Sequence, residues 1–393
     1  MRDLVLKPGR DRSPRRRHPW VLSGSVAELR GGGGIGEPGE CVRVCSAEGD
    51  VVGFGHLSPR SSIRVRMIAF GEKPPDDDWL ADRMARAVAL RGEGALCGST
   101  DALRLVNAEG DGLPGLVVDR YADVVVAVLT GAGMVLRRDA IAAALHDITG
   151  AKHGLERADR HAARSEGVAT ETRPLWGEPP PTTVPILERD RRFEVDLVAG
   201  QKTGFYLDQR DARDLVASLA AGRRVLDLYA YTGGFSVAAA RGGAREIVAV
   251  ESSSAAAELA ERHLTANAPD CPARVVRGDV ARFLRGDDPG AYDLVVVDPP
   301  PLARRKSDVV RATRAYKDVI LRALRCAAPG AHLLAFACSH HVDAALFRKV
   351  AFAASLDARR PLQVLRELSA PADHPVALDH PEGAYLTGLL LRA

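Results

Sequence analysis

Two short segments of the sequence combine residue types that can carry out covalent chemistry. Asp298 and the prolines after it, Pro299 and Pro300, follow the apolar run 294–297, and Cys338 follows the apolar run 333–337. An aspartate can hold or move a proton beside a reacting group, and paired prolines stiffen the loop that carries it. A cysteine thiolate is a strong nucleophile. An acid and a thiol at the ends of two strands therefore predict covalent catalysis.

Cys338 decides which chemistry is expected. Carbon C5 of cytosine is a poor nucleophile, but a thiolate that adds to C6 makes C5 electron-rich enough to attack a methyl group. The thiolate requires a lowered pKa, from a nearby cation or a helix start, and His340 and His341 follow directly in the chain. The alternative interpretation is a small apolar residue that fills the end of a strand, because free cysteines are often buried.

Acidic residues also stand at the ends of three other expected strands. Asp227 and Glu251 end the first two strands of the C-terminal region, and Asp279 follows the third. Glu251 is placed to bind a ribose diol, as an acid does in dinucleotide folds. Asp279 could hold an adenine amino group. Together with Asp298 these acids form a series that packing explains poorly, and the series predicts a nucleoside site.

The turn after Asp227 separates two classes of nucleotide cofactor. A dinucleotide needs the pattern G-x-G-x-x-G around its pyrophosphate, whereas this turn is Tyr231-Thr232-Gly233-Gly234-Phe235. The two glycines permit a tight turn and the close approach of a ligand, but the nearby carboxylate fits an anionic pyrophosphate poorly. The sulfonium and ammonium groups of S-adenosylmethionine fit better. The alternative is that Gly233 and Gly234 form only a turn.

A sheet must bring these residues together. Between residues 186 and 393, apolar runs alternate with helical periodicity, which predicts an α/β fold with a mostly parallel sheet and helices on both faces. The expected strands are residues 225–228, 247–250, 274–276, 294–297, 333–337, 362–368 and 386–391. The expected helices are residues 235–241, 255–267, 280–284 and 309–327. Ligands of such sheets bind at the carboxyl ends of the strands, where the acids and Cys338 are expected.

Two further blocks precede this region. In residues 1–73, short strand-like runs alternate with Gly and Pro and predict a small β-barrel or sandwich, and residues 73–78 indicate a linker. The block 74–185 mixes an expected helix at 80–91, strands at 103–106, 115–119 and 124–129, and a helix at 140–148. Residues 107–112 are expected to connect the first two of these strands as a hairpin. We therefore expect three domains, residues 1–73, 74–185 and 186–393.

The composition is that of an ordinary globular protein, with 46% hydrophobic and 27% charged residues among 393. It excludes collagen-like, disordered and disulfide-scaffold classes. The net charge is only +3, but residues 1–73 contain 13 Lys and Arg against 8 Asp and Glu.

No signal peptide and no membrane span are expected. The scattered cysteines predict free thiols in a reducing cytoplasm and no metal site; they are Cys41, Cys45, Cys97, Cys271, Cys326 and Cys338.

Over nearly its full length the sequence resembles the RlmI-type 23S rRNA 5-methylcytosine methyltransferases. Residues 7–10 and 16–24 resemble the start of that family's PUA domain, and residues 58–66 resemble its close. Residues 109–116 resemble its central hairpin, and residues 200–210 resemble the segment that leads into its catalytic domain. Further matching segments follow in order at residues 231–236, 298–300, 337–339, 372–375 and 381–386.

The resemblance implies a fold, a reaction and a set of site residues. It implies a PUA β-barrel, a central α+β domain and a Rossmann-like class I methyltransferase domain, with S-adenosylmethionine as cofactor. The implied substrate is a cytosine in 23S rRNA or in a large-subunit precursor, and a homodimer is implied too. The catalytic residues would be Cys338 and Asp298. The implied cofactor-binding residues are Phe205, Gln209, Arg210, Asp227, Tyr229, Thr232, Gly233, Gly234, Phe235, Glu251, Asp279 and Asp298. The implied RNA-binding residues are Arg10, Arg12, Arg15, Arg16, Arg17, Pro299 and Pro300.

Departures from the family pattern and two other functions stay open at this stage. Pro301 and Leu302 stand where a lysine and an aromatic residue are expected, and His340 stands where glycine is usual. An RNA N-methyltransferase could use the loop at Asp298 on an exocyclic amine without a thiol. A non-catalytic RNA-binding or ribosome-assembly factor could keep only a vestigial pocket. The N-terminal arginines fit phosphate contacts that weaken with salt, although a solvated basic arm without a partner is the alternative.

Overall fold

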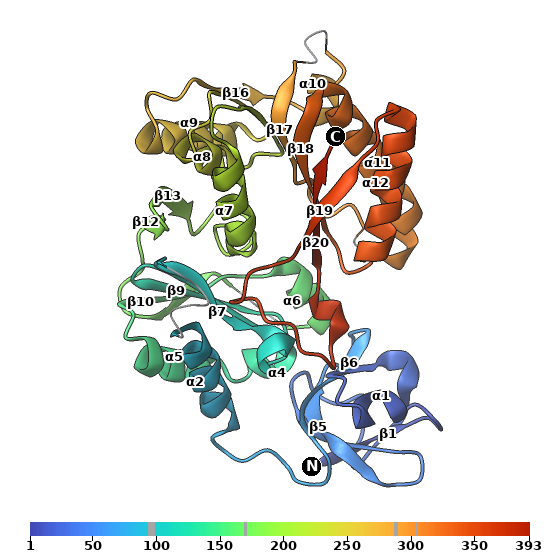
Figure 1. Cartoon of the computed structure of the whole chain (residues 1–393). Helices are drawn as coiled ribbons and strands as arrows, with labels where there is room; N and C mark the ends of the chain where they lie inside the picture. Colours follow the sequence, from blue (N-terminus) through green and yellow to red (C-terminus); the bar gives the residue numbers. More distant parts are fainter. Residues whose placement is uncertain (93–98, 169–170, 287–289, 304) are drawn as a thin grey trace. The chain divides into compact units, whose positions relative to one another are not determined.

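A computed structural model describes residues 1–92, 99–168, 171–286, 290–303 and 305–393 (Figure 1). Cys97, one of the expected free thiols, lies outside the described residues. The chain forms two compact units. The first contains Met1–Ile186, Val195–Leu207 and Ala372–Gly383, and the second contains Leu187–Glu194, Asp208–Pro371 and Ala384–Ala393. A late segment of the chain therefore belongs to the unit built mainly from its first half.

The first unit begins with a six-stranded sheet in the order β2-β6-β5-β4-β1-β3. Its strands are β1 (Arg2–Leu6), β2 (Trp20–Leu22), β3 (Val26–Arg30), β4 (Cys41–Cys45), β5 (Val51–Leu57) and β6 (Ile63–Phe70), with the short helix α1 (Arg12–Arg15) between the first two. β1 and β4 run parallel, and the other neighbours are antiparallel. Alternate side chains, among them Leu4, Leu6, Val42 and Val44, point into one core.

A second, five-stranded sheet of the same unit has the order β11-β10-β9-β8-β7. Its strands are β7 (Ala102–Asn107), β8 (Leu116–Tyr121), β9 (Val124–Leu129), β10 (His153–Glu156) and β11 (Arg173–Trp176). The helices of this part are α2 (Trp79–Gly92), α4 (Ala132–Val135), α5 (Arg138–Thr149) and α6 (Arg160–Glu166). Met84 of α2 and Ile141 of α5 share one core with the strands. The predicted hairpin between β7 and β8 is present as an antiparallel pair.

The second unit is built on a seven-stranded sheet in the order β16-β15-β14-β17-β18-β20-β19. Its strands are β14 (Arg224–Leu228), β15 (Glu246–Glu251), β16 (Ala273–Arg277), β17 (Tyr292–Val297), β18 (Ala327–Cys338), β19 (Gln363–Leu368) and β20 (Leu386–Arg392). The first five run parallel, and β20 is antiparallel to both of its neighbours. The predicted mostly parallel sheet is therefore present.

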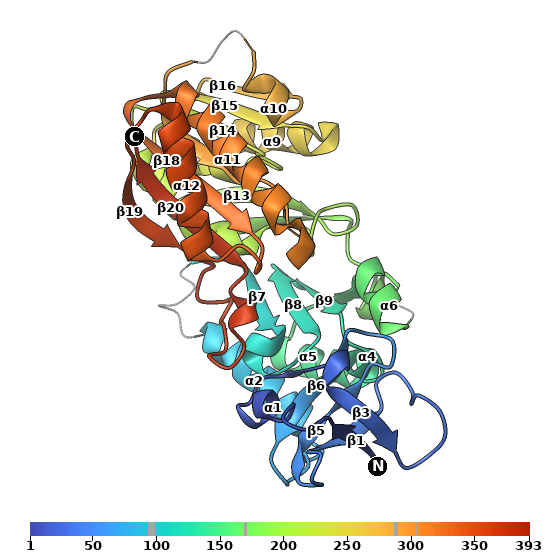
Figure 2. The same cartoon turned by 90° about the vertical axis from the view of Figure 1, so that its right-hand side faces the viewer.

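Helices cover both faces of this sheet (Figures 1 and 2). On one side lie α7 (Arg210–Leu219), α8 (Gly234–Arg241) and α9 (Ser254–Asn267); on the other lie α11 (Val309–Cys326) and α12 (Ala344–Ala358). The one-turn helix α10 (Val280–Phe283) follows β16. The central strands are mostly apolar because both of their faces are covered, as the complete burial of Leu226, Val250 and Val295 shows.

Several elements were not predicted. The helix α7 is rich in charge, yet its Arg210 and Arg213 are buried. The helix α12 is apolar on more than one side, with Phe352 and Leu356 exposed. The hairpin of β12 (Thr183–Glu188) and β13 (Arg191–Asp196) is a small separate sheet.

Within the described ranges, no helix has the length and apolarity needed to cross a membrane.

Candidate functional site

The five residues selected at strand ends lie along one edge of the second unit's sheet. In the spatial order β16, β15, β14, β17 and β18, the edge carries Asp279, Glu251, Asp227, Asp298 and Cys338. Carboxyl ends of parallel strands meet at the same edge of a sheet. The sheet order therefore places the acid and the thiol side by side and the other three acids beyond them.

Asp298 and Cys338 form the reactive pair of this edge. Asp298 comes directly after β17 and Cys338 is the last residue of β18, and Sγ lies 3.7 Å from the Asp298 Oδ1 atom. The other carboxylate oxygen accepts a hydrogen bond of 2.9 Å from the Gln209 Nε2 group. Cys338 is only partly exposed, and it forms no disulfide with any described cysteine. A carboxylate held from one side by an amide therefore points its second oxygen at the thiol.

Two further residues lie beside this pair, and the sequence singled out only Gln209, as a residue expected to bind cofactor. The Gln209 amide donates to Asp298, 89 residues away in the chain, and its contact with the cofactor stays a prediction. Tyr316 of α11 is fully buried, and burial raises its pKa, with the nearby Cys338 as the next cause. A helical period marks Tyr316 only as a core residue, so no sequence signal separates it from its neighbours.

Asp227 is the most deeply buried acid of the edge, with 1% of its surface exposed. Its Oδ2 atom accepts a hydrogen bond of 2.6 Å from the Ser236 hydroxyl, and its Oδ1 atom has no partner among the described residues. Burial raises the pKa of Asp227 to about 6, and the charge of Glu251 adds to the increase. A buried carboxylate with an unfilled acceptor site suits a ligand that brings a cation or a hydrogen-bond donor.

The stability of the folded state should depend on pH through Asp227. Its pKa is about 6 in the folded chain, against 3.8 for an unperturbed aspartate, so the folded state binds the proton more tightly. The cost of the buried charge is fully present above pH 6 and disappears as the pH falls toward 3.8. A difference of about two pKa units corresponds to about 3 kcal/mol. Asp227→Asn should therefore gain stability relative to the wild type at about pH 7.5 but not at about pH 4.

Urea unfolding followed by circular dichroism at the two pH values measures this difference. Asp270→Asn, at an exposed position of a loop, is the matched control and should show no such change with pH. A stability difference between Asp227→Asn and wild type that is equal at the two pH values would contradict the assignment of a raised pKa.

The turn between β14 and α8 has an unusual backbone. Tyr229, Tyr231 and Gly233 all have positive φ angles, of 65°, 50° and 79°. Only glycine adopts such angles without cost, so two tyrosines in this conformation are strained, and strain of this kind clusters at ligand sites. The Thr232 hydroxyl in the same turn is buried without a partner among the described residues. The turn therefore presents a second unfilled polar group close to Asp227.

The remaining predicted cofactor residues of this turn pack beneath it. Gly234 begins α8, and Phe235 is buried with its ring stacked on Phe336 at a centroid distance of 5.8 Å. Phe235 therefore supports the turn from the core. The structure gives Gly234 and Phe235 a clear packing role, and their contact with a ligand stays a prediction.

Glu251 and Asp279 bind backbone groups near the same edge. Glu251 accepts hydrogen bonds from the Tyr231 and Ser253 amides, at 2.9 and 2.7 Å, and so joins the ends of β14 and β15. Asp279 caps α10 by accepting from the Arg282 amide at 2.8 Å. Burial, with the charge of Asp279 as the next cause, raises the pKa of Tyr229 to about 12. Carboxylates have spare acceptor capacity, so these contacts leave room for ligand binding.

Two other predicted cofactor residues lie elsewhere. Arg210 is fully buried, with its Nε atom 4.0 Å from the Glu188 Oε2 atom, in a cluster that also contains Arg213 and Arg191. Phe205 belongs to the first unit, where its amide donates to the Tyr121 hydroxyl at 3.3 Å. The structure thus gives Arg210 an ionic partner and Phe205 a place in a different unit from the strand-end acids.

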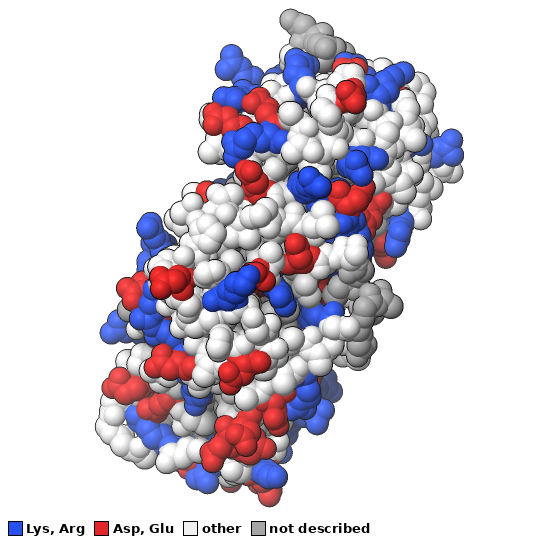
Figure 3. Space-filling view, turned by 90° about the vertical axis from the view of Figure 1, so that its left-hand side faces the viewer, with Lys and Arg blue, Asp and Glu red and all other residues white. Residues whose placement is uncertain are grey.

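The N-terminal arginines and the two loop prolines are the predicted RNA contacts. Arg10, Arg12, Arg16 and Arg17 are exposed, while Arg15 is held by Asp11 and Asp50 at 2.6 and 2.9 Å. On the face drawn in Figure 3, basic and acidic side chains are intermingled. In the loop, Pro299 is buried and Pro300 is exposed. Arg15 is therefore neutralised by its partners, and the other arginines are better placed for phosphate contacts.

A separate group of titratable side chains lies in the first unit. The His18 Nε2 and His380 Nδ1 atoms each lie 3.2 Å from the Glu382 Oε2 atom. His18 accepts a hydrogen bond at Nδ1 from the Trp20 amide, so the neutral ring carries its proton on Nε2, toward Glu382. A metal ion would need that nitrogen deprotonated and the other one donating. The tautomer of His18 therefore suits a hydrogen bond to Glu382, and the cluster connects distant segments of the chain.

Comparison with protein families gives two matches. Residues 113–373 match a family described as S-adenosylmethionine-dependent methyltransferase, and residues 4–70 match a family described as PUA-like domain. A relative from Erwinia tasmaniensis, named ribosomal RNA large subunit methyltransferase I, is 37% identical over 393 residues, which cover 99% of this chain and 98% of the relative. A relative of the same name from Alteromonas mediterranea is 39% identical over 391 residues, 98% of each chain.

Solved structures give a match to the whole fold. A Streptococcus mutans protein described as an S-adenosylmethionine-dependent methyltransferase has a TM-score of 0.85 at 23% identity, with 100% of both chains covered. A methyltransferase crystallised with S-adenosylhomocysteine has a TM-score of 0.86, again at 23% identity and complete coverage of both chains. At this identity the two structures establish a shared fold.

Proposed function

Because the chain belongs to the family of the ribosomal RNA large subunit methyltransferases I, S-adenosylmethionine-dependent enzymes with a PUA-like domain, we propose that it methylates C5 of a cytosine in 23S rRNA. The methyl donor is S-adenosylmethionine, and Cys338 forms a covalent adduct with the target base. The observation that carries the cytosine C5 assignment is the 3.7 Å contact between the Cys338 thiol and the Asp298 carboxylate.

The residues along the sheet edge fit the methyl donor. Its ammonium group suits the unfilled Oδ1 atom of Asp227 and the unpartnered hydroxyl of Thr232, both buried beside the turn. Its ribose hydroxyls suit Glu251 at the end of the next strand, and its adenine amino group suits Asp279 one strand further. When bound, S-adenosylmethionine supplies an electrophilic methyl group. Gly233 and Gly234 allow the backbone to approach it closely.

The chain's own residues would carry the remaining steps. The Cys338 thiol gives its proton to the Asp298 Oδ1 atom, and Sγ then forms a bond to C6 of cytosine. Asp298 passes the proton to N3, which takes up the electron pair displaced from the ring. C5 becomes nucleophilic and would take the methyl group from the donor, whose sulfur keeps the electron pair of the broken S–CH3 bond. Loss of the C5 proton to solvent and cleavage of the S–C6 bond then restore the double bond of the ring. N3 returns its proton through Asp298 to the Cys338 thiolate, which becomes the thiol again.

Two alternatives predict different products. An N-methyltransferase would place the methyl group on an exocyclic amine and would not require Cys338. A non-catalytic RNA-binding factor would bind RNA without transferring a methyl group. Incubation of the purified protein with unmodified rRNA and labelled S-adenosylmethionine, followed by nuclease digestion and mass spectrometry, separates them. Labelled 5-methylcytidine supports the proposal, and labelled N-methylated nucleoside, or no transfer with no donor binding, contradicts it.

The predicted domain organisation, cellular location and assembly complete the proposal. Domains 1–73 and 74–185 would hold and orient RNA, and domain 186–393 would carry the chemistry. The substrate would be free 23S rRNA or a large-subunit precursor in the cytoplasm. The family resemblance implies a homodimer, which analytical ultracentrifugation of the purified chain tests.

RNA binding by the N-terminal arginines should show in the salt dependence of affinity. Each phosphate contact makes the slope of log K against log salt more negative by about 0.7–0.9. Replacing four exposed arginines by glutamine should therefore make the slope less steep by about 3. The variant carries Arg10→Gln, Arg12→Gln, Arg16→Gln and Arg17→Gln. Filter binding of rRNA between about 50 and 300 mM salt measures the slope.

A charge-matched variant controls for the loss of net charge. It carries Arg245→Gln, Arg262→Gln, Arg274→Gln and Arg325→Gln, all at exposed positions of the second unit. Equal slopes for the two variants would show that the N-terminal arginines form a solvated arm without a specific role.

A further inference from the structure

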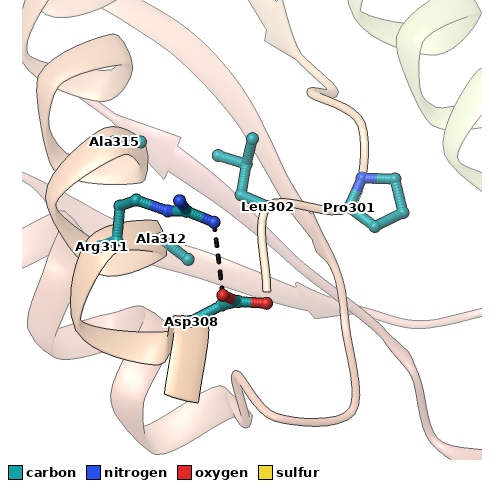
Figure 4. A pocket seen from close by; sticks show the side chains of 6 residues that line it. All are labelled: Pro301, Leu302, Asp308, Arg311, Ala312 and Ala315. Carbon is teal, nitrogen blue, oxygen red and sulfur yellow. Dashed lines mark hydrogen bonds and ion pairs between the residues drawn. The ribbon is translucent and has the colours of Figure 1, made fainter. Parts of the chain in front are cut away.

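A pocket of about 480 Å³ lies beside the loop that follows Asp298 (Figure 4). Residues of that loop, of the turn before α11 and of the first turns of α11 line it: Pro301, Leu302, Asp308, Arg311, Ala312 and Ala315. Its volume is in the range of sites that hold small organic groups. Neither Cys338 nor Asp298 lines it. The pocket is therefore a neighbour of the reactive pair and a different place from the one the target base must occupy.

The loop that forms one wall is fastened to the catalytic strand. Pro301 and Leu302 are the third and fourth residues after Asp298, and the Ser339 hydroxyl donates a hydrogen bond of 2.6 Å to the Ala303 carbonyl. Ser339 directly follows Cys338, so the far end of the loop is held next to the thiol. Leu302 also packs against the main core of this unit. The pocket wall thus has a fixed position relative to the reactive pair.

The walls and the edge of the pocket differ in chemistry. Figure 4 shows the Leu302 side chain directed toward the helix at Ala315, with the Pro301 ring beside it. At the edge, Arg311 donates to the Asp308 carboxylate at 3.3 Å, and the Arg305 amide donates to the same carboxylate at 3.1 Å. A flat group with apolar faces and polar edges, as in a nucleobase, matches this arrangement.

The charge around the pocket favours a polyanion as the source of that group. Arg305, Lys306, Arg311 and Arg314 are all exposed around the start of α11. Sites for single-stranded nucleic acid combine basic side chains, which follow the backbone, with an aromatic platform on which bases stack; here Pro301 and Leu302 would take the place of that platform. Because catalysis at C5 needs the target base turned out of its stack, the nucleotides next to it are unstacked as well and need new contacts.

We propose that this pocket holds the nucleobase adjacent to the target cytosine. The inference rests on the proposed function and adds a substrate-positioning site to it: Leu302 and the Pro301 ring cover one face of the neighbouring base, and the α11 alanines cover the other. Arg311 and Asp308 meet its polar edge. Pro301 and Leu302 also stand where the family resemblance leads us to expect a lysine and an aromatic residue.

Filling the pocket tests the proposal without touching the reactive pair. Ala315 is exposed on α11, so Ala315→Phe is expected to fold normally while its ring occupies the pocket. Ala315→Ser leaves the pocket open, and Ala345→Phe places the same ring on an exposed position of α12. Substrates are rRNAs assembled by ligation with an abasic residue on the 5′ or the 3′ side of the target cytosine.

The expected results form a double-mutant cycle that combines one change in the protein with one change in the RNA. Ala315→Phe should raise KM for rRNA about tenfold, as loss of one stacked base would, with kcat and donor affinity unchanged. An abasic residue on one side of the target should do the same to the wild type. The two changes together should cost no more than either alone. Both control variants should behave as the wild type.

Other outcomes overturn the inference. These are wild-type kinetics for Ala315→Phe, abasic substrates that bind normally on both sides, or two effects that multiply. RNA affinity, measured by fluorescence anisotropy for the same protein and RNA variants, gives the same comparison and does not require methyl transfer. If the proposed reaction is wrong, no 5-methylcytidine is formed. If the pocket does not hold the neighbouring base, the protein change and the RNA change have independent effects on RNA affinity.

Discussion

Replacing Cys338 by alanine is expected to lower methyl transfer to rRNA by about 10⁴-fold or more, since the route through a covalent adduct disappears with the nucleophile. Binding of S-adenosylmethionine should be unchanged, because the acids assigned to it lie on other strands. Cys338→Ser should be nearly as inactive, since a hydroxyl is far less readily ionised than a thiol. Methyl transfer measured with purified rRNA and calorimetry with the donor give the two readouts.

A covalent trap makes this prediction sharper. Cytosine with fluorine at C5 has no proton to lose there, so the adduct cannot break down after methyl transfer. Wild-type protein should form a denaturation-resistant complex with such RNA, and Cys338→Ala should form none. Cys326→Ala removes a buried cysteine at the end of α11 and should trap RNA normally. Full activity in Cys338→Ala would exclude the adduct and favour an N-methyltransferase.

Replacing Asp298 is expected to have the second largest effect. Asp298→Ala and Asp298→Asn should each reduce kcat by about 10²–10⁴-fold, the usual contribution of a positioned acid or base. Asn keeps the size and a hydrogen-bonding edge but cannot take the thiol proton, so similar losses in the two variants indicate proton transfer. Steady-state assays measure kcat, and single-turnover methylation at saturating protein separates the chemical step from RNA binding and product release.

Gln209 separates proton transfer from positioning. Its amide holds one oxygen of Asp298 at 2.9 Å, so Gln209→Ala should cost less, about tenfold, and Gln209→Glu should shift the pH profile because it places a second carboxylate beside the first. Asp270→Asn, which removes an acid from an exposed loop position, is the control. Near-normal kcat for Asp298→Asn would contradict proton transfer by this residue.

The sequence predicted the fold class and the alignment of strand ends, and both are confirmed. The central strands are long apolar runs because helices bury both faces of the sheet, and that pattern is visible without a structure. The residue after each run then falls at a strand's carboxyl end by geometry alone. Glu251 and Cys338 are the last residues of their strands, and Asp298 directly follows β17. The resemblance to the rRNA methyltransferase family and the cofactor are likewise confirmed.

Contacts between distant segments could not be predicted from local patterns. The hydrogen bond from Gln209 to Asp298 joins residues of two different elements, and nothing near either residue in the chain signals it. Helix α7 was not predicted because its arginines look exposed in the sequence. In the structure Arg213 is buried and neutralised by Glu188, 25 residues earlier. A charge that finds its partner only in the folded state looks like a surface charge in the sequence.

The late segment Ala372–Gly383 shows the same limitation on a larger scale. It belongs to the first unit, where the Asp373 carbonyl accepts from Arg91 at 2.9 Å and the Pro375 carbonyl accepts from Asn107 at 2.9 Å. Its loop-like composition indicates an irregular segment. Only the long-range hydrogen bonds show which part of the molecule it completes.

The central claim is that this chain forms 5-methylcytosine in large-subunit rRNA through Cys338. Its most direct test is to map 5-methylcytosine in rRNA from a strain lacking the gene, complemented with either wild type or Cys338→Ala. The account predicts that one cytosine of 23S rRNA loses its methyl group in the deletion strain, regains it with the wild type and stays unmethylated with the variant. An unchanged 5-methylcytosine map in the deletion strain, or restoration by Cys338→Ala, would contradict it.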